Sequence, residues 1–276
     1  MDTTLTIIAG IVYPGLITTL VLGLLYRWLV GGAGDRGTTS GLSAALRSRE
    51  GLAALMGILA AAGGLVALPW PAHPTGGTHT WLWAWAGIEV AFLVPLAPAL
   101  AAGAPRVVRA AVRRAQIGTF GRVLLWAAMT ASLSIHADWR FAALPTHLLS
   151  LIAAMIAFPI AVGWGPFDDE VSITEAGTQA GLPPALRWLD NQARDVASGA
   201  LLAATVVATL PTAIGPLWLR LMMIVVGFIV AGGLLRRLGG RMPRLALPDI
   251  LHLGWAYVAP LAAAAAVALI IAGRLT

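Results

Sequence analysis

The chain has 276 residues, of which 59% are apolar and only 11% are charged, and its mean hydropathy is +0.84. Ordinary soluble domains carry about a quarter charged residues, so this composition excludes a soluble globular protein and indicates a polytopic helical membrane protein. The absence of cysteine excludes disulfides and thiolate-bound metal centres, so any electrons would have to be carried by another chain. The net charge of +6 does not indicate nucleic-acid binding, because the arginines lie in short loops beside apolar segments.

Windows of about 20 residues predict eight membrane-spanning helices. In chain order their approximate bounds are 5–25, 52–68, 81–102, 120–135, 144–163, 196–214, 217–235 and 251–272. The fourth span is the weakest, because it is short and lies between Arg122 and Asp138. We therefore predict an all-α polytopic fold that forms a single membrane domain over residues 1–276.

The distribution of arginine predicts the orientation of these spans. The loops after spans one, three, five and seven, with their boundaries, hold 15 of the 18 arginines. The positive-inside rule then places both termini outside and the long loop between spans five and six, residues 164–195, in the cytoplasm. The expected location is the inner (plasma) membrane, as a multi-pass protein.

The loop at 164–195 is also the most acidic part of the chain. It holds half of the twelve carboxylic acids, namely Asp168, Asp169, Glu170, Glu175, Asp190 and Asp195. An unpaired carboxylate in hydrocarbon is costly, so this segment needs water, a protein partner or a buried polar path. A solvated loop that only docks a basic partner is the simpler alternative.

Three stretches, in this order along the chain, resemble the complex I subunit 1 family of the respiratory chain. That family includes subunit 4 of formate hydrogenlyase and the membrane subunits of energy-converting hydrogenases. Around span four, Arg113-Arg-Ala-Gln116 is similar to the family's Arg/Ala/Gln stretch. After span five, Pro166-Phe167-Asp168 is followed by Glu175 at the family's spacing. Before the last span, Arg241-Met-Pro-Arg244 is followed by Asp249-Ile-Leu-His-Leu-Gly-Trp255.

The resemblance implies a function for these residues. A member of this family is a non-catalytic membrane subunit that anchors soluble Fe–S and large catalytic subunits beside antiporter-like membrane subunits, and couples electron transfer to proton or sodium movement. Such a chain binds no cofactor alone, and a quinone would bind at the interface with a partner. Proton coupling would involve Asp168, Asp169, Glu170 and Glu175. Docking of partners would involve Arg106, Arg109, Arg113, Arg114, Arg241, Arg244 and Asp249.

The chain also departs from the family pattern. After the Arg/Ala/Gln stretch, complex I members carry a membrane glutamate, whereas this chain has Gly121. Glu89 lies mid-span in the third helix, where an ionisable residue is a functional candidate by default. We expect Glu89 to replace the missing glutamate in part. The alternative is a hydrogen-bonded glutamate that only holds helices together.

Two other classes of function stay open at this point. A free-standing secondary transporter or channel would use Glu89 and the acidic loop, and would act as a purified chain. A degenerate structural anchor would conduct no ions. The residue pattern predicts no catalytic residue, and no metal site, since His136, Asp138 and His147 are too scattered for a fixed coordination geometry.

Overall fold

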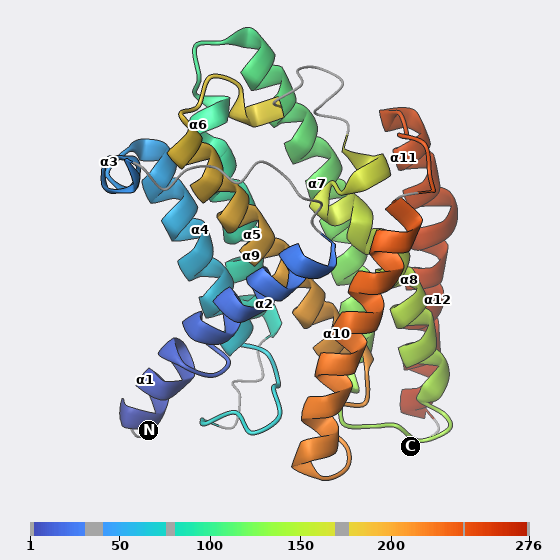
Figure 1. Cartoon of the computed structure of the whole chain (residues 1–276). Coiled ribbons are helices and arrows are strands. Elements are labelled where there is room, and N and C mark those ends of the chain that lie inside the picture. Colours follow the sequence, from blue (N-terminus) through green and yellow to red (C-terminus); the bar gives the residue numbers. More distant parts are fainter. Residues whose placement is uncertain (1–2, 31–40, 76–80, 169–176, 240, 275–276) are drawn as a thin grey trace. The chain divides into compact units, whose positions relative to one another are not determined.

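The computed structural model describes residues 3–30, 41–75, 81–168, 177–239 and 241–274, and in these ranges the chain forms helices and no strand. The all-α expectation is therefore confirmed for this part of the molecule. The α-helices are α1 (Thr3–Ile11), α2 (Leu16–Leu29), α3 (Leu42–Leu46), α4 (Arg49–Val66), α5 (Trp81–Leu93), α6 (Ala97–Leu100), α7 (Pro105–Ser134), α8 (Leu144–Val162), α9 (Pro184–Thr209), α10 (Leu217–Gly239), α11 (Leu247–Leu253) and α12 (Ala259–Arg274) (Figure 1). Short helical turns η1 (Val94–Leu96), η2 (Gly165–Phe167), η4 (Gly177–Gln179) and the π-helical η5 (Gly254–Val258) lie between them.

Six helical segments are long and apolar enough to cross a membrane, counting only the described residues. They are Thr3–Leu29, Arg49–Val66, Trp81–Leu100, Leu144–Val162, Leu217–Gly239 and Leu247–Arg274, and they coincide with six of the eight predicted spans. The predicted spans 120–135 and 196–214 lie largely in the second halves of α7 and α9. These helices have 30 and 26 residues, or roughly 45 and 39 Å, but each begins with charged turns. The eight-span count and the outside placement of the termini stay predictions.

Proline accounts for the interruptions within three of the predicted spans. Because proline has no N–H and its ring clashes with the preceding turn, a regular helix cannot continue through it unchanged. Pro14 lies between α1 and α2, and Pro95 lies where α5 gives way to η1. The π-helical turn η5 ends two residues before Pro260. Pro260 has no N–H to donate to an α-helical hydrogen bond, and the wider π-helical turn accommodates this missing bond.

The chain divides into two compact units. Unit 1 comprises Met1–Leu68, His73–Ala115 and Glu170–Leu201, and unit 2 comprises Pro69–Ala72, Gln116–Asp169 and Leu202–Thr276. In unit 1, α4 packs along α5. A Cβ atom on Gly87 would lie only 2.7 Å from the Cα atom of Gly64, so glycine permits this close approach. In unit 2, α8 packs along α12. A single membrane domain over the whole chain stays a prediction.

The second part of the predicted loop at 164–195 is helical. Helix α9 begins at Pro184, a residue whose fixed φ angle suits the first turn of a helix. Its first three turns carry Asp190 and Arg194 four residues apart, a spacing that allows an ion pair on one helix face. The acidic segment thus ends in an amphipathic helix, which continues into the apolar sequence after Asp195.

Candidate functional site

The segment around Pro166 and Phe167 lies against the segment that begins at Leu245, within unit 2. The backbone N–H of Leu245 donates a hydrogen bond to the carbonyl oxygen of Pro166 at 2.8 Å. The side chain of Phe167 is buried in one hydrophobic cluster with Ile117, Ile160 and Ile250, and the partly buried Phe120, Leu245, Leu247 and Leu253 surround it. Two of the stretches that resemble the complex I family therefore form one packed surface, to which Ile117, directly after the third stretch, also belongs.

Gly121 allows α7 and α8 to meet backbone to backbone. A Cβ atom at Gly121 would lie 2.7 Å from the Cα atom of Ala161, too close for any side chain. Small residues at such crossings let membrane helices approach closely. A glutamate side chain therefore has no room at this position in the structure.

The Gly254-Trp255 pair packs against α7 in the same unit. A Cβ atom on Gly254 would lie 2.9 Å from the Leu124 side chain, so glycine is needed for this contact. The rings of Phe120 and Trp255 are tilted by 51° with centroids 5.9 Å apart, within the range of favourable aromatic pairs. The most specific part of the C-terminal motif thus contributes to the packing of η5 on α7.

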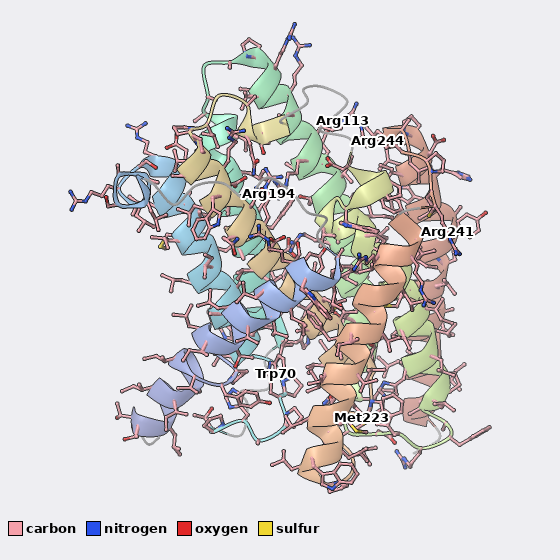
Figure 2. All side chains as sticks on the ribbon, viewed as in Figure 1. Trp70, Arg113, Arg194, Met223, Arg241 and Arg244 are labelled. Carbon is pink, nitrogen blue, oxygen red and sulfur yellow. The ribbon has the colours of Figure 1, made fainter. Side chains whose placement is uncertain are left out.

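The predicted coupling and docking residues of unit 2 lie around this surface. Asp168 directly follows η2 and is half-buried. Arg241, Arg244 and Asp249 are exposed (Figure 2). Asp169, Glu170 and Glu175 lie outside the described residues. Within unit 2, the structure therefore places four of the predicted residues on or beside the segments joined by Leu245 and Pro166.

The predicted basic cluster on α7 is only partly accessible. Arg106 and Arg109 are exposed, whereas Arg113 and Arg114 are half-buried. All four lie in unit 1. The charge of Arg114 acts on a carboxylate of α9, Asp190, whose pKa it helps to lower.

Asp190 is the centre of a polar site that the sequence did not single out. Its carboxylate accepts hydrogen bonds from Gln179 Nε2 at 2.6 Å and from Arg194 Nε at 2.9 Å. Arg194 also donates to the hydroxyl of Thr178. Burial alone would raise the pKa of Asp190, but the charges of Arg194 and Arg114 and the bond from Gln179 bring that pKa below its usual value. Asp190 is therefore an ionised, charge-paired carboxylate.

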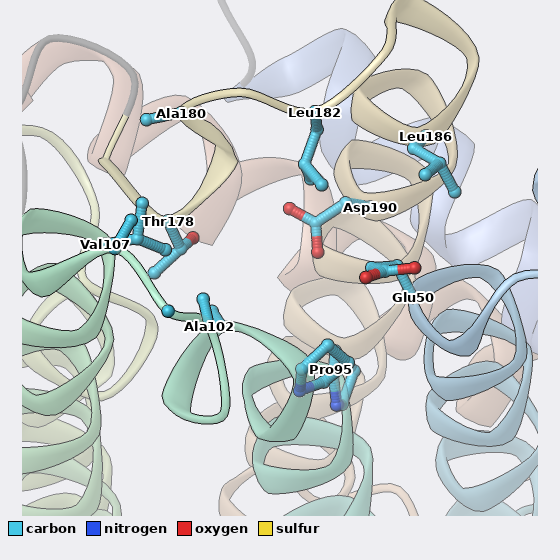
Figure 3. Close-up of a pocket in the computed structure, with 13 residues that line it drawn as sticks. Glu50, Pro95, Ala102, Val107, Thr178, Ala180, Leu182, Leu186 and Asp190 are labelled. Carbon is cyan, nitrogen blue, oxygen red and sulfur yellow. The ribbon is translucent and has the colours of Figure 1, made fainter.

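A pocket of about 150 Å³ lies beside Asp190 in unit 1 and also contains the carboxylate of Glu50 (Figure 3). Glu50 lies in the first turn of α4, whose start is capped by Ser48, since its hydroxyl oxygen accepts a bond from the Gly51 N–H at 3.0 Å. The other lining residues come from the segments 95–107 and 178–186. The lining thus comes from the cytoplasmic ends of predicted spans two and three and from the predicted cytoplasmic loops around them. The Asp190–Arg194 spacing on an amphipathic run was the available signal for this site.

Asp195, one turn further along α9, faces a different arginine. Its carboxylate lies 3.9 Å from Arg27 Nε, and its side chain is 23% exposed. Burial raises the pKa of Asp195 to about 6, although the charges of Arg27 and Arg194 act in the opposite direction. This carboxyl therefore changes its charge closer to neutral pH than an ordinary aspartate.

Glu89 lies in α5, which belongs to the same unit as this pocket. It is half-buried, between the buried Ile88 and the exposed Val90. Pro95, which lines the pocket, follows six residues later, or roughly 9 Å along the helix axis at 1.5 Å per residue. Unit 1 therefore contains Glu50 of α4 and Asp190 of α9 at the pocket, and Glu89 in α5, the helix that ends at Leu93, two residues before Pro95.

In unit 2, His136, Asp138 and His147 lie together near the N-terminal end of α8. The sequence had indicated that these residues are too scattered to form one site. His147 Nδ1 lies 2.6 Å from Ser132 Oγ, its Nε2 lies 2.9 Å from the Asp138 carbonyl oxygen, and Trp139 stacks on its ring. Burial, with the nearby His147, lowers the pKa of His136 to about 4. The described residues contain no group of three or more potential ligands that could hold a metal ion.

No protein-family model matches the chain, and no curated protein matches it.

Proposed function

We propose that this chain is an integral membrane subunit of a redox complex similar to respiratory complex I or to the group 4 membrane-bound hydrogenases. It is a non-catalytic subunit in the inner membrane that anchors the soluble electron-transfer arm and couples electron transfer to proton or sodium movement. The observation that carries the proposal is the hydrogen bond between Leu245 and Pro166, with the shared burial of Phe167 and Ile250. It joins two stretches that resemble the same family and are far apart in sequence.

This arrangement supports docking of a soluble partner. Phe167 and Ile250 give the two segments a rigid, packed base, and the charged side chains of Arg241, Arg244 and Asp249 are exposed beside it. Exposed charges on a rigid base provide electrostatic complementarity, which fixes the register and the partner more than the raw affinity. An Fe–S subunit with an acidic docking face is the expected partner.

The carboxylates of unit 1 support the coupling role. Glu50 and Asp190 line a pocket of about 150 Å³, and Glu89 lies roughly 9 Å along the helix axis from Pro95, which also lines it. Ionisable groups within a membrane are costly and mark ion or proton paths. We assign Glu50 and Asp190 to the cytoplasmic opening of such a path and Glu89 to its first intramembrane step. A quinone, where the complex uses one, binds at the interface with a partner subunit.

Affinity purification from native membranes tests the proposal. The tagged chain is extracted in a mild detergent, and the proteins that accompany it are identified by mass spectrometry. We expect a soluble Fe–S subunit, a large catalytic subunit and antiporter-like membrane proteins in fixed ratio. An Arg241→Gln/Arg244→Gln variant should lose the soluble subunits and keep the membrane ones. Recovery of the chain alone, together with ion transport by the purified chain in vesicles, would instead establish a free-standing transporter.

A further inference from the structure

A pocket of about 540 Å³ lies in unit 2 between α8 and the C-terminal end of α10. Apolar side chains line most of it, including Met155 and Ile156 from α8, Leu234 and Leu238 from α10, and Trp164 from the segment after α8. Its volume falls within the range of roughly 300–1,000 Å³ that is typical of small-molecule sites, which are likewise apolar with a few polar groups. The pocket is therefore large enough for part of an organic ligand.

Two arginines supply the charge of this pocket. Arg237 and Arg241 are its charged lining residues within the described part of the chain, and no carboxylate lines it. Both are exposed, and Figure 2 labels Arg241 just beyond the end of α10. The guanidinium group presents a planar set of donors that matches the oxygens of a phosphate group. The occupant must therefore combine a negative charge with an apolar body.

The location of the pocket identifies the apolar body as that of a lipid. Helices α8 and α10 are both long and apolar enough to span a membrane, and they end at Val162 and Gly239. The pocket lies at these ends, where phospholipid headgroups meet the acyl chains. Leu234 and Leu238 remain 46% and 51% exposed, so apolar surface is available to a chain that enters from the bilayer.

We propose that this pocket binds one anionic phospholipid, with its phosphate on Arg237 and Arg241 and an acyl chain along α8 and α10. A zwitterionic lipid does not use the two positive charges fully, because its own cation opposes them. A free phosphate does not use the apolar pocket. The inference concerns this pocket alone and does not depend on the proposed function.

Native mass spectrometry of the purified full-length chain, with any subunits that accompany it, tests this site. The probes are dioleoylphosphatidylglycerol and dioleoylphosphatidylcholine, which have the same acyl chains and different headgroup charge. We expect one tightly retained phosphatidylglycerol. Arg237→Gln/Arg241→Gln should weaken its binding by about 10-fold to 30-fold, on the scale of surface arginine–lipid attraction. Arg47→Gln/Arg49→Gln, the same charge change on exposed residues of unit 1, should leave it unchanged.

A second variant tests the apolar part. Leu234→Trp places a larger side chain at the pocket and should also weaken retention of phosphatidylglycerol, while both arginines remain. Equal binding of the two lipids, or equal loss in both double-arginine variants, would show general surface attraction and overturn the proposal. Competition by glycerol 3-phosphate at the same concentration would assign the site to a free phosphate. Binding of a neutral isoprenoid quinone unaffected by Arg237→Gln/Arg241→Gln would assign it to that ligand instead.

Discussion

The backbone N–H of Leu245 donates a hydrogen bond of 2.8 Å to the carbonyl oxygen of Pro166. The two residues follow predicted spans five and seven, and a direct bond requires both loops to lie on the same side of the membrane. The distribution of arginine independently predicts the same side for these loops, the cytoplasmic one. The bond between Leu245 and Pro166 is thus consistent with the orientation that the arginines predict.

The orientation predicts which side of the membrane is accessible at two exposed alanines. The chain has no cysteine, so Ala137→Cys or Ala246→Cys, both at exposed positions, introduces its single thiol. A membrane-impermeant maleimide should label Ala137→Cys in intact cells, and Ala246→Cys only after the membrane is opened. Labelling of Ala246→Cys from outside intact cells would show that the predicted orientation is wrong and that the proposed docking surface does not face the cytoplasm.

Gly121→Ala should destabilise the chain by about 1–3 kcal/mol, the usual cost of overpacking. The added Cβ atom would press on the backbone of Ala161 in α8. Gly233→Ala is the matched control, because a Cβ atom there meets nothing within 4 Å, and alanine favours the helix by up to about 1 kcal/mol. Thermal unfolding in detergent should therefore show a lower midpoint for Gly121→Ala and an unchanged or higher one for Gly233→Ala. Equal midpoints would mean that α7 and α8 are not in backbone contact at Gly121.

The raised pKa of Asp195, about 6 against 3.8 for an ordinary aspartate, makes stability depend on pH in an unusual direction. The folded chain holds this proton more tightly than the unfolded chain, so stability is greatest below about pH 4 and is lost as the pH rises through about 6. Asp195→Asn keeps the neutral form at every pH. It should raise the unfolding midpoint at pH 7 more than at pH 4.5, with a gain of about 3 kcal/mol at pH 7 from the size of the shift.

Asp138 provides the control for this pH dependence. Hydrogen bonds from Arg140 hold the pKa of Asp138 at about 2, so its contribution is present above pH 4 and is lost only at lower pH. Asp138→Asn should shift the midpoints at pH 4.5 and pH 7 by the same amount. A pH dependence that is identical in the wild type and Asp195→Asn would show that Asp195 is not buried as a neutral acid.

Glu89→Gln should separate ion movement from electron transfer. Glutamine keeps the shape and hydrogen bonds of Glu89 but cannot ionise, so we expect normal assembly, continued electron transfer and loss of proton translocation. Proton uptake and substrate turnover are measured together in membrane vesicles. Asp138→Asn, an acid outside the predicted spans, should retain both. Translocation at the wild-type level in Glu89→Gln would show that Glu89 only holds helices together by hydrogen bonds. It would favour the alternative that the chain is a structural anchor that conducts no ions.

The positions of the most apolar helices follow directly from the sequence. The predicted span 144–163 coincides with α8 (Leu144–Val162), and the span that starts at residue 217 coincides with α10, because a continuous apolar run determines both membrane insertion and helix formation. The full lengths of α7 and α9 do not follow, because their charged first turns resemble loops when hydropathy is averaged. In α9 the charged first turns include the ion pair between Asp190 and Arg194.

The contacts within the candidate site could likewise not be predicted from the sequence alone. The sequence does not reveal that Gly121 lies against the backbone of Ala161, because this contact joins two helices. The bond from Gln179 to Asp190 joins η4 to α9 and forms only when the turn between them is folded. The contacts between the segments that carry the motifs required the three-dimensional structure.

A photoreactive residue at the position of Arg244 tests the central claim most directly, because this exposed side chain lies on the surface proposed to dock the soluble arm, where Arg241 keeps its charge. The matched control position is Phe141, which is 91% exposed in the loop between α7 and α8. Illumination of native membranes should link position 244, and not position 141, to a soluble subunit that carries iron–sulfur clusters. Cross-links from position 244 to lipid alone, with no soluble redox protein among the products, would contradict the account.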